Sequence, residues 1–219
     1  MKKLSIVLAF VIAIFAVSPF STNAQETKTE LSKSQQKAIE KDAKKRCKEL
    51  RKAGWEPLAS TSTMEYSMNK YRTYMAQDED NRIAITGIAS GRNNKIGREN
   101  AIHSGIASYS SRAKAQIVGK VKSVISSDAN NSAQEEIDKF GAAYESGVNT
   151  KISGLVKEHF TLVRVLPDGT KEYNVFMSID ETQARKAREE AAREAAQRSA
   201  LQNLSETVSE FIGEPVEAE

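Results

Sequence analysis

The segment EHFTLVRVLPDGTKEYNVFMSI, residues 158–179, decides the fold more than any other part of the chain. Glu158–Leu166 and Glu172–Ile179 are rich in β-branched and aromatic residues, and their apolar positions follow a period of two, which is typical of strands. Between them, Pro167–Thr170 contains the Pro, Asp and Gly that tight turns favour. We therefore predict a β-hairpin. Its second strand should direct one set of side chains to one face, Tyr173, Val175, Met177 and Ile179, and the rest to the other, Glu172, Asn174 and Ser178 with Phe176.

A helix is predicted on the C-terminal side of the hairpin. Asp180 is a typical N-cap residue, and the alanine-rich stretch that follows favours a helix over about Glu181–Ile212. Its late apolar residues recur at spacings of three and four, as in a packing seam: Leu201, Leu204, Val208 and Phe211.

On the N-terminal side of the hairpin, the periodicity predicts a strand and four helices. The strand is Arg82–Ser90, with Gly87 at a bulge or a point of close approach. A glycine-bearing loop, residues 91–97, follows it. The predicted helices are about residues 31–52, 62–76 and 98–126, and one whose apolar stripe is Ala133, Ile137, Phe140, Tyr144, Val148 and Ile152.

The order α-α-β-α-α-β-β-α predicts the α+β class, with a small antiparallel-type sheet of about three strands. We expect long amphipathic helices to cover one face of this sheet. Residues 25–81 are predicted as a helical lead-in, residues 82–212 as the α+β module, and residues 213–219 as an acidic tail.

The N-terminus reads as an export signal. Lysines at positions 2 and 3 precede an unbroken apolar run, Ile6–Val17. Thr22-Asn23-Ala24 then offers small or short side chains at the positions that a signal peptidase reads, so we expect cleavage between Ala24 and Gln25. The run is shorter than the roughly 20 residues of a spanning helix. Because position 25 is Gln and not Cys, we do not expect a lipid anchor. The expected location is the periplasm or cell envelope.

Composition excludes several classes of function. The chain of 219 residues has one cysteine and two histidines, which argues against a disulfide framework and a multi-histidine metal site. Residues 25–127 carry a net charge of +9 and residues 128–219 one of −8. Over the whole chain basic and acidic residues nearly balance, and this near-neutral charge does not favour nucleic-acid binding. We expect the two halves to attract each other, within one fold or between copies.

The part from the first strand onward resembles the Lpp-twenty-like family of bacterial envelope lipoproteins. The resemblance rests on Gly87–Gly91, the long helix ending near Val121–Val124, the strands with Val163–Gly169 and Tyr173–Ile179, and the Ala/Arg/Glu helix. It extends more loosely to the N-terminal module of flagellar-assembly protein T. It implies an exported, non-enzymatic α+β module. The lipid-accepting cysteine of the family is absent here.

One loop has the chemistry of an anion site. Arg92, Lys95 and Arg98 surround the start of the long helix, where backbone N–H groups favour negative charge. The spacing is neither that of a P-loop nor that of a dinucleotide fingerprint, because Arg98-Glu99 follows Gly97 where Lys-Ser/Thr is required. A solvated loop, in which the glycines serve only to turn the chain, is the alternative that we favour.

No other group of residues predicts a site. We expect no catalytic residue, no metal ligand and no cofactor; His103, His159 and the buried thiol of Cys47 are interpreted as structural. The basic helix within residues 41–52, KDAKKRCKELRK, could bind anionic lipid. Its apolar face is weak, so we favour docking on the acidic half of the fold.

The sequence therefore predicts an exported, non-enzymatic binding or assembly module of the cell envelope, whose partner is an envelope protein or a second copy. Two alternatives stay open. A glycan- or peptidoglycan-directed hydrolase would need two carboxylates in a cleft. A homo-oligomeric scaffold would use the seam Leu201–Phe211.

Overall fold

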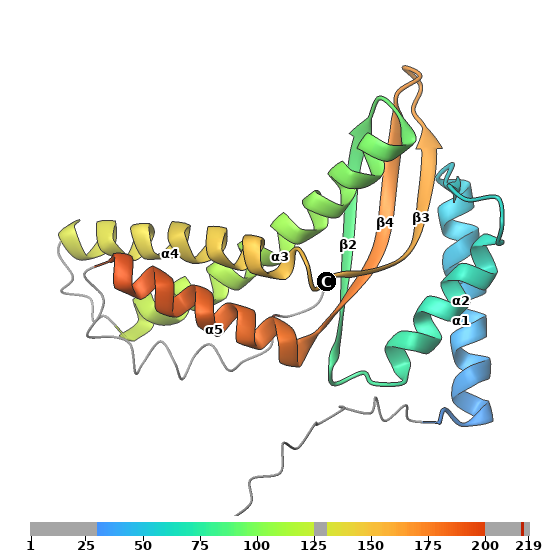
Figure 1. Ribbon diagram of the computed structural model, residues 1–219. Helices are drawn as coiled ribbons and strands as arrows, with labels where there is room; N and C mark the ends of the chain where they lie inside the picture. Colours follow the sequence, from blue (N-terminus) through green and yellow to red (C-terminus); the bar gives the residue numbers. More distant parts are fainter. Residues whose placement is uncertain (1–29, 125–130, 200–215, 217–219) are drawn as a thin grey trace, which may run out of the picture.

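The computed structural model describes residues 30–124, 131–199 and 216, which form five α-helices and one four-stranded sheet (Figure 1). The class is α+β, as predicted. The elements are, in chain order, α1 (Lys33–Lys52), β1 (Glu56–Pro57), α2 (Met64–Ala76), β2 (Arg82–Gly91), α3 (Asn94–Val124), α4 (Asn131–Ile152), β3 (Lys157–Val165), β4 (Lys171–Asp180) and α5 (Glu181–Arg198). Among the described helices, none has the length and apolarity to cross a membrane.

The sheet has the order β1-β3-β4-β2, and every neighbouring pair is antiparallel. The predicted hairpin is confirmed as β3 and β4. Its turn is closed by a 2.9 Å hydrogen bond from Gly169 N to Leu166 O, with Gly169 at a φ of +80°. The prediction of about three strands in the order given above was wrong by one strand. β1, which pairs with Leu162 and Val163, has two residues and a proline, too little to produce a periodic pattern.

α3 begins at Asn94, four residues before the predicted start. The prediction placed Gly97 in a loop, because glycine usually interrupts a helix. In the structure Gly97 lies in the first turns of α3, where a Cβ atom would come within 2.0 Å of the Tyr173 ring. The glycine therefore permits close packing of the helix on β4.

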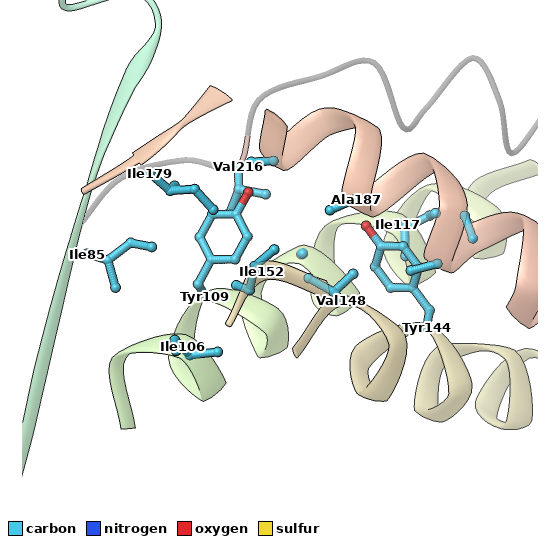
Figure 2. Close-up of a cluster of buried hydrophobic side chains, with 14 of the residues drawn as sticks. Ile85, Ile106, Tyr109, Ile117, Tyr144, Val148, Ile152, Ile179, Ala187 and Val216 are labelled. Atoms are coloured by element: carbon cyan, nitrogen blue, oxygen red, sulfur yellow. The ribbon is translucent and has the colours of Figure 1, made fainter. Parts of the chain in front are cut away.

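Helices pack on both faces of the sheet, whereas the sequence predicted that helices cover one face. On the first face, α3 lies across β2 and β4, and α4 and α5 extend its core (Figure 1). We call this the α3-side core. Figure 2 shows its centre, where Tyr109 lies among Ile85, Ile152, Ile179 and Val216.

Gly87 is the point of closest approach on this face. A Cβ atom there would lie 1.8 Å from the carbonyl oxygen of Ala101 and 2.7 Å from the backbone nitrogen of Gly105. The backbones of β2 and α3 therefore meet directly, which fixes the position of α3 on the sheet. Of the two roles predicted for Gly87, the structure supports the close approach.

The second face is covered by α1 and α2, which pack on β3 and β4. The buried residues of this α1–α2-side core are Ala43, Cys47, Leu50, Trp55, Met64, Met68, Tyr71, Leu162 and Phe176. Because β4 lies between the two cores, Tyr173 through Ile179 are all buried, including Asn174 and Ser178, which were predicted on the face opposite Tyr173. α1 and α2, from the segment 25–81, thus share a core with the sheet.

The second half of α3 packs with α4 and α5 into a helical arm that extends away from the sheet (Figure 1). The predicted stripe of α4 is confirmed from Ile137 to Ile152, while Ala133 lies outside the side chains described. α5 ends at Arg198, since Ser199 is extended. The prediction of one uninterrupted helix from Glu181 to Ile212 was therefore wrong, because the helix is broken at Ser199. The seam Leu201–Phe211 lies outside the described residues.

Candidate functional site

The structure does not gather the predicted anion-binding residues into one site. The side chain of Asn93 caps the start of α3, because its Oδ1 accepts the N–H of Ile96 at 3.0 Å. Arg98 turns away from this helix end and forms a two-pronged ion pair with Glu158, with Nε to Oε1 at 2.8 Å. Arg92 and Lys95 stay exposed. The predicted cleavage site, Ala24 and Gln25, lies outside the described residues.

Arg98 and Glu158 line a pocket of about 340 Å³ beside the bulge in β3. The bulged residue, His159, also lines it, and its Nε2 lies 2.8 Å from the hydroxyl of Ser178. Its ring packs between Tyr71 and Tyr74, with ring centroids 4.9 and 4.7 Å away. Partial burial, with the nearby cations of β3 and β2, lowers the pKa of His159 to about 4.

This His–Ser pair has a structural role. A nucleophilic serine must reach its substrate, but Ser178 lies on the central strand and is 2% exposed. Glu158, the carboxylate of this pocket, is already engaged by Arg98 and by Thr161, whose hydroxyl donates to Glu158 Oε1 at 2.8 Å. The pair therefore satisfies polar groups between α2 and the sheet. Sequence reasoning did not foresee it.

A second buried polar cluster joins α5 to α3. The guanidinium of Arg188 donates to both carboxylate oxygens of Glu181, at 2.5 and 3.1 Å, and to the hydroxyl of Tyr109 at 2.5 Å. Arg188 is 2% exposed. Its partners lie within the α3-side core, so the cluster fixes the angle at which α5 leaves the sheet. A substrate has no access to it from the described surface.

The free edge of β2 is the feature with the clearest capacity for binding. In an antiparallel pair, opposite residues alternate between exchanging backbone hydrogen bonds and directing these groups outward. Asn81 O accepts the N–H of Glu181 at 2.8 Å, and these two residues continue the β2–β4 register. Odd-numbered residues of β2 therefore bond to β4. The even-numbered residues Ala84, Thr86 and Ile88 direct their N–H and C=O groups to the outer edge.

Within the described part of the chain, no strand pairs with this edge. α3 reaches only its end, where the side chain of Asn100 donates to Ser90 O at 3.1 Å. The sequence Ile83–Ser90 carries no charge and no proline, although natural edge strands are usually protected by one or the other. The edge can therefore accept another strand.

The face beside this edge is also uncovered. α2 reaches Arg82, which donates to Tyr74 O, and partly covers Ala84. Farther along β2, Thr86 and Ser90 are exposed, and Ile88 is 47% exposed. The neighbouring Asn174 is buried, and its Oδ1 accepts no hydrogen bond from the residues that the structure describes.

A hollow of about 710 Å³ continues the edge at the end of β2. It lies between the start of α3 and the β3–β4 turn, and Ser90, Arg92, Ile96 and Asn100 line it. Ile96 is 43% exposed and supplies an apolar surface. Arg92, one of the three predicted anion-binding residues, supplies a positive charge. The other two do not line this hollow.

The described residues contain no group of three or more His, Cys, Asp or Glu side chains that could hold a metal ion. Comparisons of the chain with protein-family models, with curated proteins and with solved structures found no match in any of the three.

Proposed function

We propose that this protein is an exported, non-enzymatic module of the bacterial cell envelope that binds an extended segment of an envelope protein along the edge of β2. The observation that carries the proposal is the uncharged, unpaired edge at Ala84, Thr86 and Ile88, next to an exposed strand face. An added strand would satisfy these backbone groups, and its side chains would cover Ile88. Export rests on the apolar run Ile6–Val17 and its flanks.

The hollow beyond β2 indicates which side chains the bound segment should carry near one end. A strand that continues past Ser90 would place one residue near Ile96 and another near Arg92. We therefore expect the bound segment to contain alternating apolar residues and a carboxylate close to one end. This arrangement uses the charge of Arg92 without requiring Lys95 or Arg98 at the same place.

The hydrolase alternative gains no support from the pocket beside His159. Glycoside hydrolysis requires two carboxyl groups about 5–10 Å apart. Among the residues that line this pocket, Glu158 is the one carboxylate, and it is paired with Arg98. We therefore place the function at the edge of the sheet and not in this pocket.

Site-specific photo-crosslinking tests the proposal. A benzophenone amino acid would replace Ile88, and a matched control would carry it at Tyr66, which is 63% exposed on α2. We expect a crosslink to an envelope protein from position 88 only, and its loss when Thr86→Lys adds a charge to the edge. Equal crosslinking from both positions, or crosslinking that survives Thr86→Lys, would contradict the proposal.

A second copy of the chain is the other occupant that the edge could accept. Crosslinked products distinguish it, since a self-adduct has twice the mass of the chain and contains no foreign peptide. Size-exclusion chromatography over a range of concentrations gives the same distinction in solution. A self-adduct from position 88 would replace the proposed function with a homo-oligomeric scaffold.

A further inference from the structure

Six lysines form a row along the outside of α1. They recur at spacings of three and four: Lys33, Lys37, Lys41, Lys45, Lys48 and Lys52. Since each helical residue turns by 100° and rises by 1.5 Å, the six lie within a sector of about 120° and the row is about 28 Å long. We call this set the lysine row.

The lysine row faces away from the rest of the protein. The buried residues of α1, Ala43, Cys47 and Leu50, lie on the opposite side of the helix and pack into the α1–α2-side core. All six lysines are exposed. α1 lies at the margin of the molecule, on the far side of the sheet from α3 (Figure 1). The row is therefore an outermost, convex surface.

The charge of the row is not compensated. α1 contains nine cationic and three acidic side chains, hence a net charge of +6. Each of the three acids has another partner: Glu40 pairs with Lys44, Asp42 with Arg72, and Glu49 with Arg46. None of the six lysines has an ion-pair partner among the described residues. The prediction that this helix docks on the acidic half was wrong for its charged side chains, because the ion pairs that leave α1 go to Glu65 and Arg72 of α2, within the basic half.

We propose that the lysine row binds the surface of an anionic lipid bilayer. Charge complementarity is the basis of this assignment, because a row of uncompensated lysines attracts the phosphates of acidic lipids. The shape selects a flat partner: a straight, convex row on an outermost helix can bring all six ammonium groups to one plane. This inference is independent of the β2 edge, which lies on another part of the molecule.

Other polyanions fit the row less well. It contains no aromatic side chain on which a base or a sugar could stack. Lysine is a point charge without the planar fork with which arginine grips individual phosphates. The polar groove of about 900 Å³ between α1 and α2 includes only Lys33 and Lys37 of the row. An extended polymer in that groove would leave four lysines unused.

Binding through this row depends on charge alone. Ala43, Cys47 and Leu50 are buried in the α1–α2-side core, Ile39 is half-buried, and the exposed Ala38 is too small to anchor the helix in a bilayer. Attachment should therefore be reversible, strongly weakened by salt, and proportional to the fraction of acidic lipid.

Vesicle co-sedimentation of the protein as recovered from cells tests this inference. The probes are phosphatidylcholine vesicles with and without phosphatidylglycerol. We expect binding only to the acidic vesicles, and loss of binding at high salt. The triple variant Lys37→Gln, Lys41→Gln, Lys45→Gln should lower the partition coefficient about 100-fold, as expected for three lysines near such a surface.

A charge-matched control separates the row from net charge. Lys122, Lys171 and Lys186 are exposed on α3, β4 and α5, and their triple change to Gln removes the same charge. It should leave partitioning within about twofold of the parent. Equal losses from both triple variants would overturn the inference. So would binding of inorganic polyphosphate through the row without binding to acidic vesicles, which would assign the row to a soluble polyanion.

Discussion

The two faces of the sheet are built in different ways. On the α3 side, helix and strand backbones meet at Gly87, and a buried ion pair fixes α5. On the α1–α2 side, two shorter helices cover β3 and β4 but leave Thr86 and Ile88 exposed at the edge. The comparison teaches that one face supplies the rigid frame, whereas the other carries the groups that are free to bind.

The buried ion pair should give the largest effect. Glu181→Gln leaves the guanidinium of Arg188 buried without its carboxylate, and we expect the free energy of unfolding to fall by about 3–5 kcal/mol. The matched change on the other side is Glu65→Gln, which removes the half-exposed partner of Arg51 and should cost about 0–1 kcal/mol. Urea denaturation measures both. Similar losses in the two variants would remove the distinction between the faces.

Gly87→Ala should give the next largest effect. The new Cβ would collide with the backbone of α3, which cannot move as a flexible side chain would, and we expect a loss of about 3 kcal/mol. Gly119→Ala, in α3 itself, is the control, because nothing lies within 4 Å of the added Cβ atom. It should stabilise the protein by about 0.5–1 kcal/mol. A tolerated Gly87→Ala would mean that α3 is not fixed on β2.

His159 should make the α1–α2 side sensitive to acid. The pKa of His159 is about 4 in the folded protein, whereas its ordinary value is 6.5. Between pH 4 and 6.5 the unfolded chain therefore binds a proton at this histidine that the folded protein does not bind. Stability should therefore fall as the pH drops from about 6.5 to 4, by about 1–2 kcal/mol after allowance for its exposed part. The variant His159→Gln should lack this part of the pH dependence. If the free energy of unfolding depends on pH in the same way in the parent and in His159→Gln, His159 is not the source of the acid sensitivity.

Asn174→Leu should give the smallest effect, with the opposite sign. The buried Oδ1 of Asn174 has no hydrogen-bond partner among the described residues, so an apolar side chain of similar size should raise the free energy of unfolding by about 1 kcal/mol. Thermal unfolding of the two proteins measures the change. A clear loss of stability would show that the amide is satisfied in the folded state.

The sequence predicted the elements with long, regular patterns. The hairpin with its Pro167–Thr170 turn and the stripe of α4 follow from local periodicity and turn chemistry, which operate over short distances. β1 could not be predicted, because two residues carry no period. The burial of Arg188 in an alanine-rich helix and of Ser178 in β4 depends on hydrogen-bond partners far away in the chain.

The candidate site could not be predicted from the sequence, because it too depends on contacts between residues far apart in the chain. The residues of β2 were predicted as a strand, but a strand pattern does not say which strand lies at an edge. Only the pairing order β1-β3-β4-β2 shows that β2, and not β3 or β4, lies at an edge of the sheet. The basic pattern of α1 was visible in the sequence. That Asp42 of α1 pairs with Arg72 of α2, and not with a lysine of the row, became clear only from the packing of α2.

Residue-specific amide hydrogen exchange in β2 tests the central claim, that this strand offers a free edge. We expect the outward amides of Ala84, Thr86 and Ile88 to exchange at least about 10-fold faster than the inward amides of Ile85, Gly87 and Ala89 in the dilute protein. Equal protection of both sets under these conditions would mean that the edge is already covered, and it would contradict the account.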